Sequence, residues 1–471
     1  MGRADAGELA GARVVVMGLG AHGGGAASAR FCAQAGADVT VTDLRDEEAL
    51  ARSVAELSDL PVRFVLGRHD EADFRHADIV VKNPAVRRDV ALLRHAARIE
   101  TDVSLFLQLH HGPIIAITGT QGKSTTASAL HHILREDHPT ARLGGNITVS
   151  PLSFASELTG TEPIVLELSS FQLGDLLLTQ LGAEATAAFT VSAVTNVMPD
   201  HQDYYASMSD YAADKALIFA SQRHDSWCLL SADDRWSRAY RPPQPQRVVR
   251  VSRTARPNDD GPSAGFADGW GVLHLPESDR PVRLVEPDSR AAGEHQRTNL
   301  LYAGAAALLF GVRAETVRRR AREFPGIAHR LESLGEVRGV RFVNDSAATI
   351  AEAVLAAVGS FTARVHLIAG GSDKGVPLDA FAEVAQRTGS IHLLGGSATD
   401  RLIALLDSLG LPYRGPYRTL EDAFDGAVRA AGDGEVVLLS PGCASFGMFQ
   451  NEFDRGDQFR SLVAAHRAVV E

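Results

Sequence analysis

The chain has 471 residues. Since one hydrophobic core usually organises roughly 150 residues, this length predicts about three domains. Hydrophobic residues make up 45% and charged residues 22%, which is the balance of a globular protein and excludes a mostly disordered or fibrous chain. The formal net charge of -11 argues against a generally basic nucleic-acid surface, while local basic pockets for anionic small molecules remain allowed.

The three cysteines, Cys32, Cys228 and Cys443, lie far apart and form no zinc or redox motif, which favours a reducing compartment. The N-terminal residues lack the apolar core of a signal peptide, and no apolar run is long enough to span a bilayer. We therefore expect a cytoplasmic protein that works as a monomer and binds neither nucleic acid nor membrane.

A small α/β domain is predicted for residues 1–105. Apolar runs at 14–17 and 38–42 flank a glycine-rich turn and an alanine-rich stretch, which is a strand-turn-helix-strand pattern. A further run at 77–81 ends at Asn83-Pro84, where the proline disfavours helix in its predecessor.

A second domain is predicted for residues 106–326, since the apolar strand at 114–118 feeds another glycine-containing turn and then a helix. The runs at 163–168 and 187–191 are short and apolar, as buried parallel strands are. Prolines and glycines interrupt residues 241–290, for which we expect irregular loops and hairpins rather than a domain.

The α/β alternation resumes in a third predicted domain, residues 327–471. Its expected strands lie at 340–344, 365–369, 391–394 and 436–440. The predicted fold class is thus α/β with three domains: a Rossmann-like domain, a central parallel sheet of the P-loop ATPase type and a C-terminal Rossmann-like domain.

The first glycine-rich turn, Gly18 to Gly23, matches G-x-G-x-x-G directly after a strand, and Asp43 ends the next strand. Glycines let backbone amides approach a pyrophosphate at a helix N-terminus, and an acid at this spacing suits a ribose hydroxyl. Taken alone, the turn suggests an NAD-dependent oxidoreductase. The alternative is that the glycines only permit tight packing of helix against sheet.

The second turn gives the sharper signal. It runs from Gly119 through Thr120, Gly122 and Lys123 to Ser124 and Thr125, and is one residue shorter than the usual G-x-x-x-x-G-K-[ST] loop. Backbone amides would surround the phosphates of a nucleoside triphosphate, Lys123 would offset their charge, and Ser124 would ligate magnesium.

Three further residues are ambiguous by themselves. Glu167 ends a predicted strand, where a magnesium ligand could lie or merely a surface charge. His201 follows a proline turn, and a single loop histidine is usually only solvated. Lys215 lies on a predicted helix, where a solvated lysine is the ordinary interpretation.

Six strings in order along the chain carry a resemblance to one family. They are GTQGKSTT at 119–126, ELSSFQL at 167–173, AHRLE at 328–332, NDS at 344–346, GGSDKG at 370–375 and SPGCASFGMF at 440–449. This set resembles the Mur ligases, ATP-dependent amide-forming enzymes of peptidoglycan synthesis, and most closely their glutamate-adding branch. The resemblance covers essentially the whole chain and reassigns the first glycine turn to the uridine diphosphate end of a substrate.

The resemblance implies roles at matching positions. The UDP-substrate would be held by Gly20, Ala21, His22, Asp43, Arg45, Asn83, Asn146, Ser169 and Gln172. ATP would be held by Gly119, Thr120, Gly122, Lys123, Ser124, Thr125, Asn299, Arg330 and Asp345. Two Mg²⁺ ions would be held by Ser124, Glu167, His201 and Lys215, the last as a carbamylated lysine, and Lys123, His201 and Lys215 would be catalytic. Glutamate would meet Thr349, Lys374 and Ser445.

The implied partners are UDP-N-acetylmuramoyl-L-alanine and glutamate, joined through an acyl phosphate while the third domain closes over the second. D-glutamate is favoured, with a divergent branch that adds L-glutamate as the alternative. Departures from the usual pattern are Gln121, Thr148, Ala347 and the order Glu452-Phe453. The last two remove a cation and add an anion beside the expected amino-acid pocket, where Lys374 or Arg455 would have to compensate.

Two other classes of protein would also explain parts of the sequence. A dehydrogenase would explain the first glycine turn but leave the Lys123 loop idle. A nonenzymatic nucleotide-binding scaffold would fit if Glu167, His201 and Lys215 lay far from that loop. Folylpolyglutamate synthetase, a cousin of the Mur ligases, lacks a comparable UDP domain.

Overall fold

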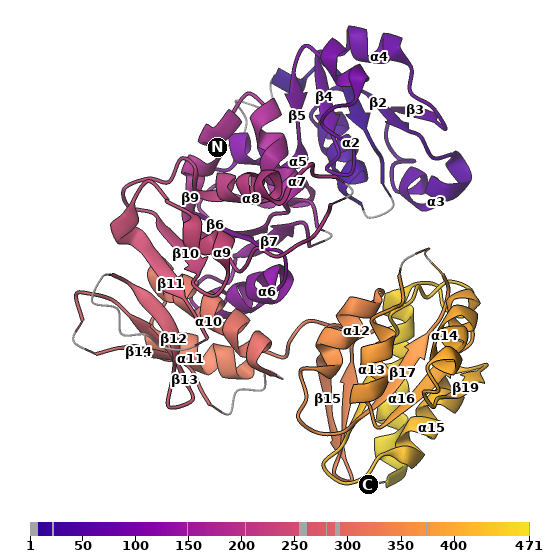
Figure 1. Ribbon diagram of the computed structural model, residues 1–471. Coiled ribbons are helices and arrows are strands. Elements are labelled where there is room, and N and C mark those ends of the chain that lie inside the picture. The colour runs from indigo at the N-terminus through magenta and orange to yellow at the C-terminus, as the bar shows by residue number, and fades with distance from the viewer. Residues whose placement is uncertain are drawn as a thin grey trace. The chain divides into compact units, whose positions relative to one another are not determined.

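The computed structural model describes residues 8–20, 23–147, 149–202, 204–253, 261–278, 280–287, 293–373, 375 and 377–470. The chain divides into two compact units, Met1–Ser289 with Thr298–Arg322, and Arg290–Arg297 with Glu323–Glu471. Figure 1 shows helices packed on sheets in both units. No helix in the described part of the chain combines the length and apolarity needed to cross a membrane.

The first unit begins with a five-stranded parallel sheet of order β3-β2-β1-β4-β5. Its strands are β1 (Arg13–Met17), β2 (Asp38–Asp43), β3 (Val62–Leu66), β4 (Ile79–Lys82) and β5 (Ile99–Glu100), and its helices are α2 (Gly24–Gln34), α3 (Glu47–Ala55), α4 (Glu71–His76) and α5 (Asp102–Leu109). Alternate residues of β1 face opposite layers: Val14 lies in the core with Ala29 of α2, and Val15 in the core with Phe74 of α4. Both faces are therefore covered, as the apolar run predicts.

A nine-stranded sheet of order β14-β13-β12-β11-β10-β9-β6-β8-β7 follows in the same unit. Its strands are β6 (Ile114–Thr118), β7 (Arg142–Gly145), β8 (Ile164–Glu167), β9 (Phe189–Val194), β10 (Trp227–Ser231), β11 (Val248–Val251), β12 (Ser263–Ala267), β13 (Trp270–His274) and β14 (Val282–Val285). The helices are α6 (Lys123–Leu134), α7 (Ser170–Asp175), α8 (Met208–Ala216), α9 (Arg235–Ala239), α10 (Gly293–Phe310) and α11 (Ala314–Glu323); the first residues of α10 are assigned to the second unit.

The prediction of irregular structure for residues 241–290 is partly wrong. β11 and β12 continue the parallel ladder from β10, and β12, β13 and β14 pair antiparallel as the expected hairpins. The apolar groups are short and broken by glycine and proline, so the sequence pattern alone does not reveal that they extend the sheet at its edge.

The second unit holds a six-stranded sheet of order β15-β16-β20-β17-β18-β19, in which β15 is antiparallel to its neighbour. Its strands are β15 (Glu332–Val337), β16 (Val340–Asn344), β17 (Val365–Gly370), β18 (Ser390–Leu394), β19 (Arg414–Tyr417) and β20 (Val436–Leu439). The helices are α12 (Ala351–Val358), α13 (Phe381–Arg387), α14 (Ser397–Ser408), α15 (Leu420–Ala430) and α16 (Glu452–Val470). Residues of α12 to α14 form the core on one face and residues of α15 and α16 the core on the other.

Three parallel-rich sheets confirm the predicted α/β class with three domains. Strands predicted at 14–17, 114–118 and 340–344 are observed within a residue of those bounds. The domain boundaries after residues 105 and 326 remain predictions, since the compact units join the first two sheets.

Candidate active site

Four of the residues expected to bind the UDP-substrate, Gly20, Asp43, Arg45 and Asn83, lie around the first glycine turn. The Asp43 carboxylate accepts hydrogen bonds from the Gly20 amide at 3.2 Å and from Nη2 of Arg45 at 3.1 Å. Asn83 lies so close that a Cβ atom added at Gly18 would meet the Asn83 Cβ at 2.9 Å. Ala21 and His22 lie outside the described residues.

Asp43 is buried at 7% exposure, and burial by itself raises its pKa. The hydrogen bonds from Arg45 and Gly20 outweigh this effect, so the pKa of Asp43 lies below its ordinary value. The carboxylate is therefore charged at neutral pH and can accept further hydrogen bonds, as recognition of a ribose or a base requires.

The second glycine turn joins β6 to α6 as a phosphate-binding loop would. Gly122 is the N-cap of α6 with φ of +81°, and a Cβ atom there would lie 2.3 Å from Oδ1 of Asn299. Asn299, a predicted ATP contact, thus packs directly against the loop. Nζ of Lys123 donates to the carbonyls of Gly119 at 3.0 Å and Thr120 at 2.9 Å.

Ser124 and Thr125 occupy the first turn of α6, so their amides point out of the helix N-terminus together with those of the loop. A helix N-terminus with free amides favours anions. The arrangement is the one that the sequence predicts for binding phosphates.

Lys215 reaches the same loop from α8. Its Nζ donates to the Gly119 carbonyl at 2.8 Å, and the side chain is 1% exposed. Burial, together with the positive charge of Lys123, lowers the pKa of Lys215 to about 6, although the carboxylates of Asp200, Asp214 and Glu167 act in the opposite direction. Lys215 is therefore a largely neutral amine at neutral pH.

Glu167 ends β8 beside these lysines and is 1% exposed. Its Oε1 accepts from Nδ2 of Asn146 at 2.9 Å, whereas its buried Oε2 has no hydrogen-bond partner among the described residues. A buried carboxylate oxygen without a donor is costly unless a cation binds it. The observation fits the oxygen ligand that Mg²⁺ prefers.

His201 lies on the rim of this region with its side chain 43% exposed. It adopts φ of +51°, and its ring lies 4.8 Å from that of Phe171 and 6.1 Å from that of Tyr211. No three His, Cys, Asp or Glu side chains of the described part converge closely enough to hold a metal by themselves. The predicted ligand set also includes Ser124 and Lys215, which are of other types.

Ser169 and Gln172 form the N-terminal cap of α7. The Gln172 amide donates to Oγ of Ser169 at 3.2 Å, and the Ser169 amide donates to Oε1 of Gln172 at 3.0 Å. This capping box explains both residues structurally. It also leaves them at the helix N-terminus that follows Glu167, so a substrate contact remains a prediction for them.

Tertiary structure adds residues that the sequence analysis did not single out. Oγ1 of Thr195 donates to the Gln121 carbonyl at 2.6 Å, and Oδ1 of Asn196 accepts from the Gln121 amide at 2.9 Å. The hydroxyl of Tyr211 lies 3.0 Å from Oγ1 of Thr120. Residues after β9 and on α8 therefore hold the phosphate loop in place through hydrogen bonds. In the sequence, the signal for these contacts is the polar pair Thr195-Asn196 directly after the apolar run of β9.

The second unit carries the remaining predicted residues. Asp345, at the end of β16, accepts from Oγ of Ser440 at 2.8 Å and from the Leu331 amide at 3.0 Å. Burial raises the pKa of Asp345 to about 7. Arg330 is exposed on the neighbouring turn, between His329 with φ of +62° and Leu331 with φ of +46°.

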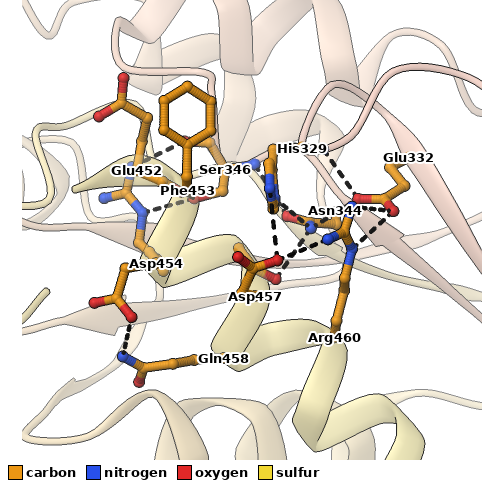
Figure 2. A network of polar contacts seen from close by, with 12 residues as sticks. His329, Glu332, Asn344, Ser346, Glu452, Phe453, Asp454, Asp457, Gln458 and Arg460 are labelled. Atoms are coloured by element: carbon orange, nitrogen blue, oxygen red, sulfur yellow. Dashed lines mark hydrogen bonds and ion pairs between the residues drawn. The ribbon is translucent and has the colours of Figure 1, made fainter. Parts of the chain in front are cut away.

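A polar network holds this turn (Figure 2). Nδ2 of Asn344 lies 3.0 Å from Nδ1 of His329 and donates to Oε2 of Glu332 at 3.0 Å. Arg460 on α16 pairs with Glu332 at 2.7 Å and with Asp457 at 2.6 Å. These contacts stabilise two left-handed residues, so Arg330 has a defined position between them.

Thr349 is half-buried after β16, and Ser445 is buried after β20. Lys374 and Thr148 lie outside the described residues. Parallel strands bring the two segments together, because β16 pairs with β20. The expected amino-acid pocket is thus built on adjacent carboxyl ends of one sheet, where such sites occur in α/β folds.

Comparison with known proteins agrees with this arrangement. Residues 12–104 match the family model of the Mur ligase MurD-like N-terminal domain, and residues 117–307 match that of the Mur ligase middle domain. A protein of Roseiflexus sp. (strain RS-1), named UDP-N-acetylmuramoylalanine--D-glutamate ligase, is 43% identical over 97% of this chain and 99% of its own. One of the same name from Treponema pallidum (strain Nichols) is 38% identical over 97% and 98%.

Solved structures show the same fold. UDP-N-acetylmuramate-alanine ligase MurC from Thermotoga maritima superposes with a TM-score of 0.58 at 17% identity, covering 97% of this chain and 100% of that one. The sequence identities of 43% and 38% to the two named relatives are far higher than the 17% identity at which the MurC fold is still shared. The chain belongs to the Mur ligase family of ATP-dependent ligases.

Proposed function

We propose that this protein joins D-glutamate to UDP-N-acetylmuramoyl-L-alanine, with ATP converted to ADP and phosphate. Relatives at 35–43% identity over nearly the full chain carry the name of that activity. Their names favour D-glutamate over the L-glutamate alternative, and the family favours a ligase over a dehydrogenase. We further propose that the enzyme acts as a monomer in the cytoplasm.

The observation that supports the proposal best is the environment of Lys215. A buried, largely neutral amine lies 2.8 Å from the phosphate-loop carbonyl of Gly119, and the Glu167 carboxylate acts on it from nearby. Only a neutral amine can add carbon dioxide, and the carbamate that forms is an oxygen ligand. Lys215 is therefore suited to carbamylation, which turns a cation into a carboxylate-like group beside the loop.

The reaction requires two anions, a carboxylate and a triphosphate, to approach each other. The amides at the start of α6 and the ammonium of Lys123 would bind the phosphates and offset their charge. Mg²⁺, when bound, supplies further positive charge to the transferring phosphoryl group, and Glu167, Ser124, His201 and carbamylated Lys215 are the residues that would hold it.

The substrate's UDP end would lie at the first glycine turn, where Gly20, Asp43, Arg45 and Asn83 come together. Its carboxylate would then attack the γ-phosphorus of ATP, break the bond to the β,γ-bridging oxygen and displace ADP, giving an acyl phosphate. The amine of glutamate attacks the acyl carbon, phosphate leaves, and an amide forms. Thr349, Lys374 and Ser445 are the residues proposed to hold the glutamate.

The test is release of phosphate from ATP in the presence of UDP-N-acetylmuramoyl-L-alanine, measured with D-glutamate, L-glutamate or no amino acid. We expect release with D-glutamate. Preference for L-glutamate would select the alternative branch, and no release with either isomer would refute the ligase assignment. Oxygen-18 placed in the substrate carboxylate should appear in the released phosphate, because the acyl phosphate transfers that oxygen.

A further inference from the structure

Arg455, on the first turns of α16, is a buried cation whose contacts are all neutral. Its side chain is 0% exposed. Nε donates to Oγ of Ser346 at 2.9 Å, Nη2 donates to the Ser346 carbonyl at 2.9 Å, and Nη1 donates to the Cys443 carbonyl at 3.3 Å. In the part of the chain that the structure describes, no carboxylate forms an ion pair with it.

A charge in this position is unusual, because buried arginines are normally paired with an acid. Burial lowers the pKa of Arg455 to about 10, which still leaves the guanidinium protonated at neutral pH. The nearby Cys443 thiol offers no counter-charge, since burial raises its pKa to about 11. The Glu452 carboxylate raises the pKa of Arg455 but forms no ion pair with it, so the positive charge is only partly offset in a weakly polarisable environment, where its field is poorly screened.

The acceptors of Arg455 lie on the two segments that build the expected amino-acid pocket. Ser346 precedes Thr349 by three residues after β16, and Cys443 precedes Ser445 by two residues after β20. Oγ of Ser346 also donates to the Glu452 carbonyl at 2.7 Å. Arg455 therefore links both segments to α16 through hydrogen bonds.

The charges around these segments otherwise do not favour an acidic ligand. Ala347, next to Ser346, is uncharged, and the Glu452 carboxylate makes no hydrogen bond or ion pair with the described residues (Figure 2). Arg401 is paired with Asp373 at 2.7 Å. Arg455 is thus a buried cation that forms no ion pair with the described residues, and the acid that acts on it is the unpaired Glu452 carboxylate.

We propose that Arg455 is a positioning and specificity-determining residue whose counter-charge is the side-chain carboxylate of the incoming amino acid. It acts through Ser346 and through its field, so that an acidic amino acid is held more tightly than a neutral one of the same length. This inference rests on the proposed ligase function and names the group that selects the amino acid in it.

The experiment compares glutamate with glutamine, its neutral amide, in the phosphate-release assay. Arg455→Met should lower kcat/KM for glutamate by roughly tenfold or more, mainly through KM, while kcat/KM for glutamine stays within about threefold. Arg455→Lys keeps the charge and should retain most of the preference. Arg467→Met is the matched control, since Arg467 lies on the same helix and donates to the neutral Leu334 carbonyl at 2.8 Å.

Equal losses with glutamate and glutamine, or an unchanged preference, would show that Arg455 has only a structural role. If Arg455→Met does not fold, Arg455→Gln decides the question, because an amide can still donate to the two segments but carries no charge. Hydroxylamine trapping of the acyl phosphate without any amino acid separates the two proposals. Wild-type protein that forms no hydroxamate refutes the ligase function, whereas normal trapping with an unchanged amino-acid preference refutes only the role of Arg455.

Discussion

Replacement of Lys82 by methionine should destabilise the first unit strongly. Nζ of Lys82, at the end of β4, lies 2.5 Å from Oδ2 of Asp175, at the end of α7, and both side chains are 0% exposed. The pair links the sheet that carries the first glycine turn to the helix that follows Glu167. Loss of the ammonium leaves the Asp175 carboxylate buried without its partner, which costs about 3–5 kcal/mol in comparable sites.

Desolvation of the two buried charges has the opposite effect on the stability that the pair contributes. Burial is the largest influence on both groups: it lowers the pKa of Lys82 and raises the pKa of Asp175 to about 6. Mutual attraction therefore offsets only part of the desolvation cost. The double variant Lys82→Met with Asp175→Leu should consequently recover most of the lost stability, because neither charge remains buried.

The assay is urea unfolding followed by tryptophan fluorescence, since Trp227, Trp236 and Trp270 all lie in the first unit and report on it. Lys82→Met should shift the midpoint to lower urea, and the double variant should return it most of the way. The reasoning is wrong if the single variant loses less than about 1 kcal/mol or if the double variant is as unstable as the single one.

Three other predictions concern the site and the second unit. Lys123→Ala should abolish phosphate release while leaving the urea midpoint nearly unchanged, because the Lys123 ammonium donates to two carbonyls of its own loop; residual turnover above one hundredth of wild type would contradict a role in phosphate binding. Lys215→Ala should lose activity that added short carboxylates partly restore, and failure of every carboxylate to do so would count against carbamylation. His392 is 0% exposed, and burial lowers its pKa from 6.5 to about 4. The folded state thus favours its neutral form, so the stabilisation is present above pH 6.5 and is lost as the pH falls towards 4. Acidification from about pH 7 to 5 should therefore cost the second unit about 1–2 kcal/mol in urea unfolding followed by circular dichroism, since the tryptophans report on the first unit, and His392→Gln should reduce this loss. An equal loss in both proteins would assign the acid sensitivity to other groups.

The α/β class and the two glycine turns were readable from the chain itself. Both depend on local rules: a short apolar run between turn residues forms a buried strand, and glycines after a strand open a helix N-terminus to phosphates. The six strings likewise identified the family before any contact was known. In residues 241–290 the hairpins followed from this reasoning, but the addition of β11 and β12 to the parallel ladder did not, since those strands are defined by pairing at the edge of the central sheet and carry little pattern of their own.

For the site, the sequence by itself determined which residues carry suitable chemistry, and the tertiary structure decided what state they are in. Lys215 is an ordinary lysine by its helical pattern, but burial beside the loop of Gly119 removes its water and lowers its pKa to about 6. The sequence names Arg455 only as a cation that could compensate beside the expected amino-acid pocket, whereas the fold shows that it is buried and donates to neutral acceptors. Protonation and charge balance depend on desolvation and on groups distant in sequence, and only the folded chain brings these together.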